Sequence, residues 1–280
     1  MNLPHLGLCC VSNIMTSNTH DVSRQWLNLV SAPAMWILST LPQIMDWGRS
    51  AKEFSDANNS LLVPYGLAFS IWFPIFVGCI GYALLQAMKT KRTRSIFRNS
   101  GWWTGIGFTG VCIWALFSGW GSPMIARWGT ALIFVPTVYC FVKAMLILTR
   151  EKHALDKMER LWVWAPISLI AGWTSIAIFL NWTPIVVGGF VTSVPDIAPN
   201  LLMLTAALVW AVCVTRRSKG NAIYAFPIIW GLGWMAFKAL TQNPTSDAIG
   251  IAALIGFGIV SIAVFVFRKR SSTLGSSIRT

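Results

Sequence analysis

Eight apolar runs of about 20 residues divide this chain, and most of its basic residues fall in short clusters between them. An α-helix of that length spans the hydrocarbon core of a bilayer. The runs lie at residues 25–45, 64–88, 101–120, 126–148, 161–183, 199–215, 221–240 and 248–267. The chain is also 55% hydrophobic and only 11% charged, which is more apolar surface than a soluble domain of this length buries in one core. The sequence therefore predicts an all-α fold, a polytopic membrane bundle of eight transmembrane helices.

The formal net charge of +13 comes from basic residues that cluster between the apolar runs rather than along one face. Placing the N-terminus in the cytoplasm leaves four of the 22 Lys and Arg residues outside (Arg49, Lys52, Arg127 and Lys238) and therefore 18 inside. Such a bias is the positive-inside pattern of membrane proteins. We therefore expect a multi-pass protein of the cell (plasma or inner) membrane with both termini cytoplasmic, in contact with membrane lipid and not with nucleic acid.

The polar residues argue against several classes of chemistry. The six cysteines form no CxxC pair and the three histidines lie outside the runs, so we expect no metal site. No nucleophile with a neighbouring base can be assembled, which makes an enzyme the less favoured interpretation. No Asp or Glu lies within a run, and ion-coupled carriers usually keep an ionisable group there, although backbone carbonyls can also bind ions.

The chain has 16 Trp residues, and many lie near the ends of runs, as in an interfacial belt. Trp72, Trp114 and Trp173 lie deeper, in the predicted outer half of the membrane. Each shares a helix face with nearby aromatic or small residues at spacings of three or four. Such faces are either core packing or the wall of a flat cavity for a large planar apolar ligand. The candidate ligand-binding residues on these faces are Tyr65, Phe69, Trp72, Phe76, Trp114, Phe117, Trp173, Ala177 and Asn181.

Three segments resemble the TspO/translocator family, the tryptophan-rich sensory proteins. Residues 64–76, PYGLAFSIWFPIF, are similar to the family's second helix, which opens at a Pro-rich mouth and then carries a Trp and an aromatic four residues on. Residues 112–117 resemble the aromatic part of its third helix, and residues 165–182 resemble its fifth. The resemblance covers residues 25–183.

The resemblance suggests a division of the chain. Residues 1–24 would form a poorly ordered N-terminal segment and residues 25–183 a TspO-like five-helix bundle. Residues 184–267 would add three transmembrane helices, and residues 268–280 would form a basic cytoplasmic tail.

The resemblance also implies a function. The family's bundle binds porphyrin-like tetrapyrroles, sterols or similar apolar molecules under a loop that follows the first helix, here residues 47–63. A porphyrin or haem-like ligand is therefore expected, and a homodimer is left open. Three hypotheses remain: a ligand-binding sensor or regulator, a transporter of small apolar molecules, and an enzyme acting on the ligand. Binding is preferred because the runs contain neither an ionisable group at mid-span nor a nucleophile with its base.

Overall fold

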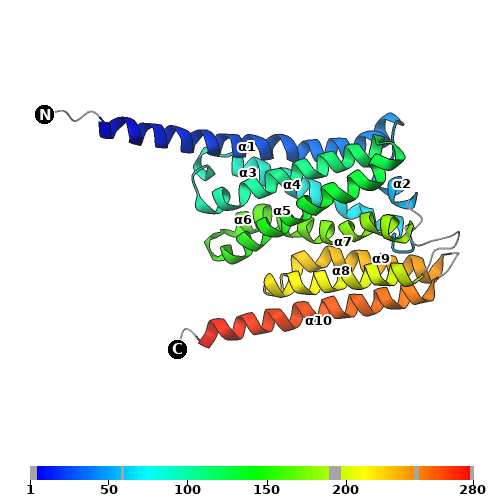
Figure 1. The fold of residues 1–280 in the computed structure, drawn as a ribbon. Helices are drawn as coiled ribbons and strands as arrows, with labels where there is room; N and C mark the ends of the chain where they lie inside the picture. Colours follow the sequence, from blue (N-terminus) through cyan, green and yellow to red (C-terminus); the bar gives the residue numbers. More distant parts are fainter. Residues whose placement is uncertain (1–4, 58–59, 189–196, 243–245, 278–280) are drawn as a thin grey trace.

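The computed structural model describes residues 5–57, 60–188, 197–242 and 246–277, and these residues form helices joined by short turns, with no strand among them (Figure 1). In chain order the elements are α1 (His5–Met45), α2 (Ala51–Asp56), η1 (Gly66–Ile71), α3 (Trp72–Ala87), η2 (Lys89–Lys91), α4 (Ser95–Trp120), η3 (Ile125–Gly129), α5 (Thr130–Arg150), η4 (Lys152–Ala154), α6 (Lys157–Glu159), η5 (Arg160–Trp164), α7 (Ala165–Gly188), α8 (Ile197–Arg217), α9 (Ala222–Thr241) and α10 (Asp247–Ser277).

Each predicted run corresponds to a helical segment, with a few residues at the ends of two runs outside it, and the all-α polytopic bundle is confirmed. Among the described residues, six helical segments are long and apolar enough to cross a membrane, namely Gly66–Ala87, Ile125–Arg150, Lys157–Val186, Ile197–Arg217, Ala222–Thr241 and Asp247–Ser271. The two remaining long helices, α1 and α4, carry more polar and small residues, many of them buried against other helices. The count of eight membrane spans therefore stays a prediction.

The helix α1 begins at His5, well before the first apolar run. The sequence analysis expected a poorly ordered segment up to residue 24; residues 5–24 belong to the helix α1, and the degree of order of this segment stays a prediction. An apolar run marks only the part of a helix that fits the bilayer, so its start does not mark the first helical residue.

The helix α7 lies in the middle of the bundle (Figure 1). It packs against α3 and α5 on one side and against α8 and α9 on the other, while α1 and α10 form opposite edges. Gly172 allows α7 and α9 to approach closely, because a Cβ there would clash with the carbonyl oxygen of Tyr224. The three later helices are thus packed directly onto the first part of the bundle.

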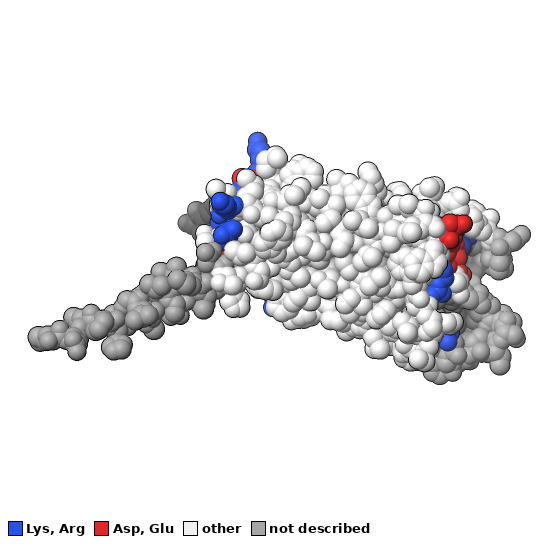
Figure 2. All heavy atoms as spheres, turned by 90° about the horizontal axis from the view of Figure 1, so that it is seen from above, with Lys and Arg blue, Asp and Glu red and all other residues white. Residues whose placement is uncertain are grey.

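Charged residues gather at the two ends of the molecule and leave a broad uncharged band between them on the face drawn in Figure 2. An uncharged band between charged ends is what a bilayer requires of a protein that spans it. The start of α1 and the end of α10 lie at the same end of the bundle (Figure 1). We call this end the terminal end and the opposite one, where α2 lies, the α2 end.

Candidate functional site

Three aromatic rings stack face to face near the α2 end. Phe76 of α3 lies 5.9 Å from Trp36 of α1 with the ring planes 14° apart. Phe76 also lies 5.1 Å from Trp72, with the planes 15° apart. Because Phe76 is buried and both indoles are only partly buried, the stack presents indole surface beside an apolar core.

This stack borders a cavity of about 220 Å³. The side chains around the cavity come from four parts of the fold. They are Trp36, Ser39, Thr40 and Gln43 of α1; Ala51 and Lys52 of α2; Phe69, Ser70, Trp72, Phe73 and Phe76 of η1 and α3; and Trp114 of α4. We call this cavity the aromatic pocket. Its wall is mostly apolar, and Lys52 is the one cation among its lining residues.

Four of the nine candidate residues line the aromatic pocket: Phe69, Trp72, Phe76 and Trp114. Trp173 lies directly behind two of them, with its ring centroid 6.1 Å from that of Trp72 and 6.1 Å from that of Phe69, both edge-on. Its side chain is only 2% exposed. Trp173 therefore supports the pocket wall from the core.

Two further candidates position Trp114 rather than lining the pocket. The Trp114 Nε1–H donates to Oδ1 of Asn181 at 2.9 Å, and the Asn181 side-chain amide donates to the Ala177 carbonyl at 2.8 Å. The indole is thereby fixed in one orientation by α7. Phe117, the remaining candidate on α4, lies beside Gly129 of η3 instead.

Tyr65 points away from the aromatic pocket and packs on α9. Its ring centroid lies 5.6 Å from that of Trp234 and 5.3 Å from that of Phe237, and its backbone N–H donates to the Trp234 carbonyl at 3.2 Å. Tyr65 does not share a helix face with Phe69 and Trp72, as was expected, because residues 66–71 form a 3₁₀-helix. Four residues then turn by roughly 120° relative to each other instead of about 40° in an α-helix.

The sequence analysis missed the contribution of α1 to the aromatic pocket. Trp36, Thr40 and Gln43 all line it, and their spacings of four and three put them on one helix face. That pattern could have been found in the sequence, but nothing in it indicates which helix the face meets. The sequence analysis treated Lys52 only as a basic residue on the outer side of the membrane.

The short helix α2 covers the aromatic pocket from outside. Ser50 and Glu53 form a capping box at its start, and the hydrogen bonds that Glu53 accepts from Ser50 hold the pKa of the Glu53 carboxyl below its usual range. Phe54 meets the Trp114 ring edge-on at 6.1 Å. Lys52 pairs with Asp56 at 2.5 Å, and Asp56 lies 3.8 Å from Lys238 of α9. Residues 58–59 of the predicted lid lie outside the described residues.

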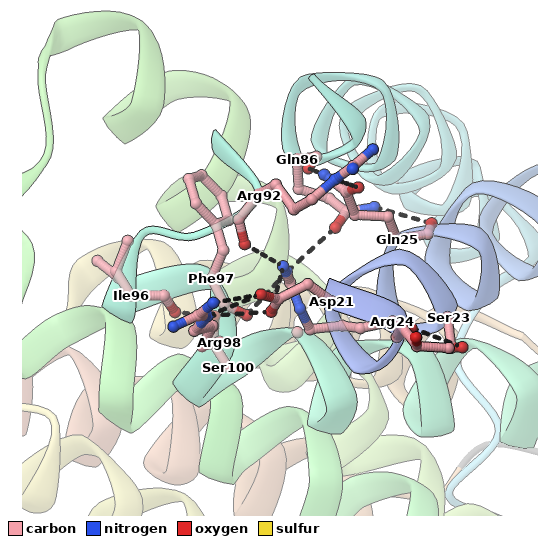
Figure 3. Close-up of polar contacts among 12 residues, drawn as sticks. Asp21, Ser23, Arg24, Gln25, Gln86, Arg92, Ile96, Phe97, Arg98 and Ser100 are labelled. Carbon is pink, nitrogen blue, oxygen red and sulfur yellow. Dashed lines mark hydrogen bonds and ion pairs between the residues drawn. The ribbon is translucent and has the colours of Figure 1, made fainter. Parts of the chain in front are cut away.

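A buried polar cluster joins α1, α3 and α4 at the terminal end (Figure 3). Arg24 is fully buried, and its guanidinium donates to the carbonyls of Arg92 at 2.7 Å and Phe97 at 3.0 Å. Asp21 lies 3.4 Å from Arg24 and accepts from the Arg98 Nε–H at 2.9 Å. One carboxylate thus faces two guanidinium groups.

A chain of amides and hydroxyls continues this polar cluster along α1. Gln25 and Gln86 exchange hydrogen bonds with each other's backbone carbonyls at 2.6 and 3.0 Å. Thr104 donates to Asn28 at 2.6 Å and lies 2.8 Å from the Tyr82 hydroxyl. The sequence analysis missed this cluster, although residues 21, 24, 25 and 28 are spaced as one polar helix face. The cluster connects three helices to one another and is separate from the aromatic pocket.

Comparison with known proteins gives one match. Residues 25–266 match the family model described as TSPO-like protein. The match continues past residue 183 through α8 and α9 and into α10, so it also includes the three helices that the sequence analysis placed outside the resemblance. No curated protein and no solved structure matches the chain.

Proposed function

The chain belongs to the TSPO-like protein family, and from that premise we propose that it binds a flat, apolar small molecule in the aromatic pocket. A porphyrin-like tetrapyrrole or a sterol-like molecule is the ligand class. The protein's role is sensory or regulatory: binding of the ligand changes the position of α2.

The observation that carries this proposal is the parallel stack of Trp36, Phe76 and Trp72. Two partly buried indoles and the buried ring that stacks on both of them border the cavity. A flat conjugated ligand gains both stacking and apolar burial against such a wall. Trp114, held in orientation by Asn181, adds a further aromatic surface to the wall.

The proposed role of α2 follows from the size of the aromatic pocket. At about 220 Å³, the pocket is smaller than the roughly 300–1,000 Å³ usual for sites that bury a drug-sized ligand. A tetrapyrrole therefore requires α2 to move outward, which separates Phe54 from Trp114. The displaced α2 is the element through which occupancy of the pocket is communicated to a partner.

Lys52 distinguishes the two ligand classes. A porphyrin that bears carboxylates can pair with the Lys52 ammonium in place of Asp56, whereas a sterol has no anionic group. We therefore expect the Lys52→Met variant to lose about fivefold in affinity for protoporphyrin, which corresponds to about 1 kcal/mol for one partly exposed ion pair. Its affinity for cholesterol should stay unchanged.

Equilibrium binding of protoporphyrin to the purified protein, followed by quenching of tryptophan fluorescence, tests the proposal. The matched variants are Trp72→Ala, which removes an indole from the pocket wall, and Trp102→Ala, which removes an exposed indole from α4 outside the pocket. Selective loss of affinity in Trp72→Ala supports the assignment.

Cholesterol added as a competitor tests whether a sterol occupies the same pocket as protoporphyrin. Displacement of protoporphyrin by cholesterol shows that both occupy the same pocket. If neither protoporphyrin nor cholesterol binds to folded protein, or if Trp72→Ala and Trp102→Ala bind equally well, the proposed function is wrong.

A further inference from the structure

A second, larger cavity of about 470 Å³ lies at the terminal end of the bundle. Its walls come from three segments far apart in the chain: the end of α5 with η4 and η5, the turn between α8 and α9, and the last part of α10. It therefore lies where the first part of the bundle meets the three later helices. We call this cavity the basic pocket.

Four cationic side chains line the basic pocket: Arg150, Lys152, Lys219 and Arg268. No Asp or Glu is among the residues that line it. Within the described ranges, none of the ion pairs involves any of these four side chains. Among the described residues, their positive charges thus face a common space without an acidic partner.

Lys152 is held in place on the wall of the basic pocket. Its Nζ lies 3.7 Å from the centre of the Trp164 ring, and the Trp164 Nε1–H donates to Thr149 Oγ1 at 3.1 Å. Burial, together with repulsion from Arg160 and Arg268, lowers the pKa of the Lys152 ammonium. Cations from η4 and α10 are therefore close enough to repel each other, and an anion between them would relieve that repulsion.

The turn between α8 and α9 is shaped to bring Lys219 to α10. Gly220 has a φ of +72°, and a Cβ there would lie 2.5 Å from the Arg268 backbone nitrogen, so the turn rests directly on α10. Lys219 itself has a φ of 56°, a conformation in which Asn or Gly is more usual than Lys. The first residues of α9 also line the basic pocket, and the start of a helix carries partial positive charge.

A topology signal alone does not explain this arrangement. The positive-inside bias depends on the number of Lys and Arg residues in short loops and is met wherever their side chains point. Here four cations from three separate segments converge on one concave site. Basic pockets between transmembrane helices are known to receive anionic head groups.

We propose that the basic pocket binds a phosphate-bearing anion. The phosphodiester of an anionic phospholipid and the phosphate of a small soluble compound share this chemistry. The proposal does not depend on the aromatic pocket, which lies at the opposite end of the bundle.

The test uses the full-length protein purified in neutral detergent and measures how each probe raises its unfolding temperature. The probes are short-chain phosphatidylglycerol, short-chain phosphatidylcholine, inorganic phosphate and glycerol phosphate. The pocket variants are Arg268→Gln and Lys219→Asn, since Asn tolerates the backbone conformation at residue 219. The matched controls, Arg270→Gln and Arg217→Gln, each remove one exposed charge nearby on α10 and α8 from residues that do not line the pocket.

We expect a probe that stabilises the wild type to bind about fivefold more weakly to each pocket variant, the usual effect of one basic side chain near an anionic head group. Both control variants should bind like the wild type. Stabilisation by phosphatidylglycerol alone identifies the site as a lipid site, and stabilisation by glycerol phosphate or inorganic phosphate identifies a soluble ligand.

The proposal is overturned if no anionic probe stabilises the wild type, or if phosphatidylcholine stabilises it as strongly as phosphatidylglycerol. It is also overturned if the control variants lose as much affinity as the pocket variants. Protoporphyrin affinity measured on the same four variants should stay at the wild-type value, which separates this site from the aromatic pocket.

Discussion

Trp72 and Trp173 meet edge to face, with ring centroids 6.1 Å apart and planes at 84°. The sequence analysis placed both indoles among the candidate ligand-binding residues. In the structure Trp72 lines the aromatic pocket while Trp173 is buried behind it, and we infer different roles for the two indoles.

We therefore expect the two alanine variants to differ. Trp72→Ala should lower protoporphyrin affinity by roughly thirtyfold, or about 2 kcal/mol for lost stacking and apolar burial. Trp173→Ala should mainly reduce the free energy of unfolding, by about 3–5 kcal/mol as for other large core truncations. Affinity and thermal unfolding measured on both variants check this division. Equal loss of affinity with unchanged stability in Trp173→Ala would instead place Trp173 in contact with the ligand.

A second prediction concerns the hydrogen bond between Trp114 and Asn181. Asn181→Leu removes the acceptor and leaves the buried Nε1–H of Trp114 without a partner, which should cost about 1–3 kcal/mol of stability. The double variant Asn181→Leu with Trp114→Phe removes both polar groups. It should therefore lose less stability than the sum of the two single variants. Thermal unfolding of the wild type, the two single variants and the double variant gives the coupling energy between the two residues. If the losses of the two single variants add up to the loss of the double variant, the hydrogen bond contributes nothing to stability.

Much of the fold could be predicted from the sequence, because apolar length and basic flanks are properties of one helix at a time. The path of the chain around residue 65 could not, since the choice of a 3₁₀-turn depends on how Tyr65 docks on Trp234 and Phe237 of α9. Which helices contact one another depends on packing between residues that are far apart in the sequence. Trp72, Phe76 and Trp114, which line the aromatic pocket, were therefore among the predicted site residues, while Phe73 on α3 and Trp36 on α1, which stacks on Phe76, were not.

We expect a fall in pH to destabilise the helix α2. The pKa of Glu53 is lowered in the folded protein by hydrogen bonds from Ser50. The stabilising contribution of the capping box is therefore complete above the ordinary Glu pKa of 4.5 and is lost as the pH falls through the lower folded value. Hydrogen-exchange protection of residues 51–57, compared between neutral pH and a pH below that range, measures this loss.

Glu53→Gln is the matched control for the acid effect. Glutamine also completes a capping box but has no proton to gain, so its protection should change little with pH. The same fall in protection in both proteins would show that acid acts on α2 through another group.

The orientation of the chain gives a further prediction. The 18-to-4 distribution of basic residues predicts that the terminal end lies in the cytoplasm. A membrane-impermeant maleimide added to intact cells should label a cysteine introduced at exposed Ala57 and should leave one introduced at exposed Arg270 unlabelled. The wild type gives the background from native cysteines. Labelling at residue 270 before the cells are opened would contradict the predicted orientation.

The last prediction tests the buried carboxylate of Asp21. It faces the buried guanidinium of Arg24 and the half-exposed one of Arg98, so Asp21→Asn leaves Arg24 buried without a counter-charge. Removing one partner of such a pair typically costs about 3–5 kcal/mol. Arg98→Gln should cost less, because Asp21 keeps Arg24 as its partner.

Lys52→Gln is the control for this series, since it breaks an ion pair whose side chains are 55% and 40% exposed and should change stability by about 0–1 kcal/mol. Denaturant unfolding in mixed micelles ranks the three variants. Adding Arg24→Leu to Asp21→Asn should restore part of the loss, because the unpaired buried charge is then gone. If Asp21→Asn is as stable as the wild type, the carbonyls of Arg92 and Phe97 satisfy Arg24 without a carboxylate, and the cluster is held together by its neutral hydrogen bonds.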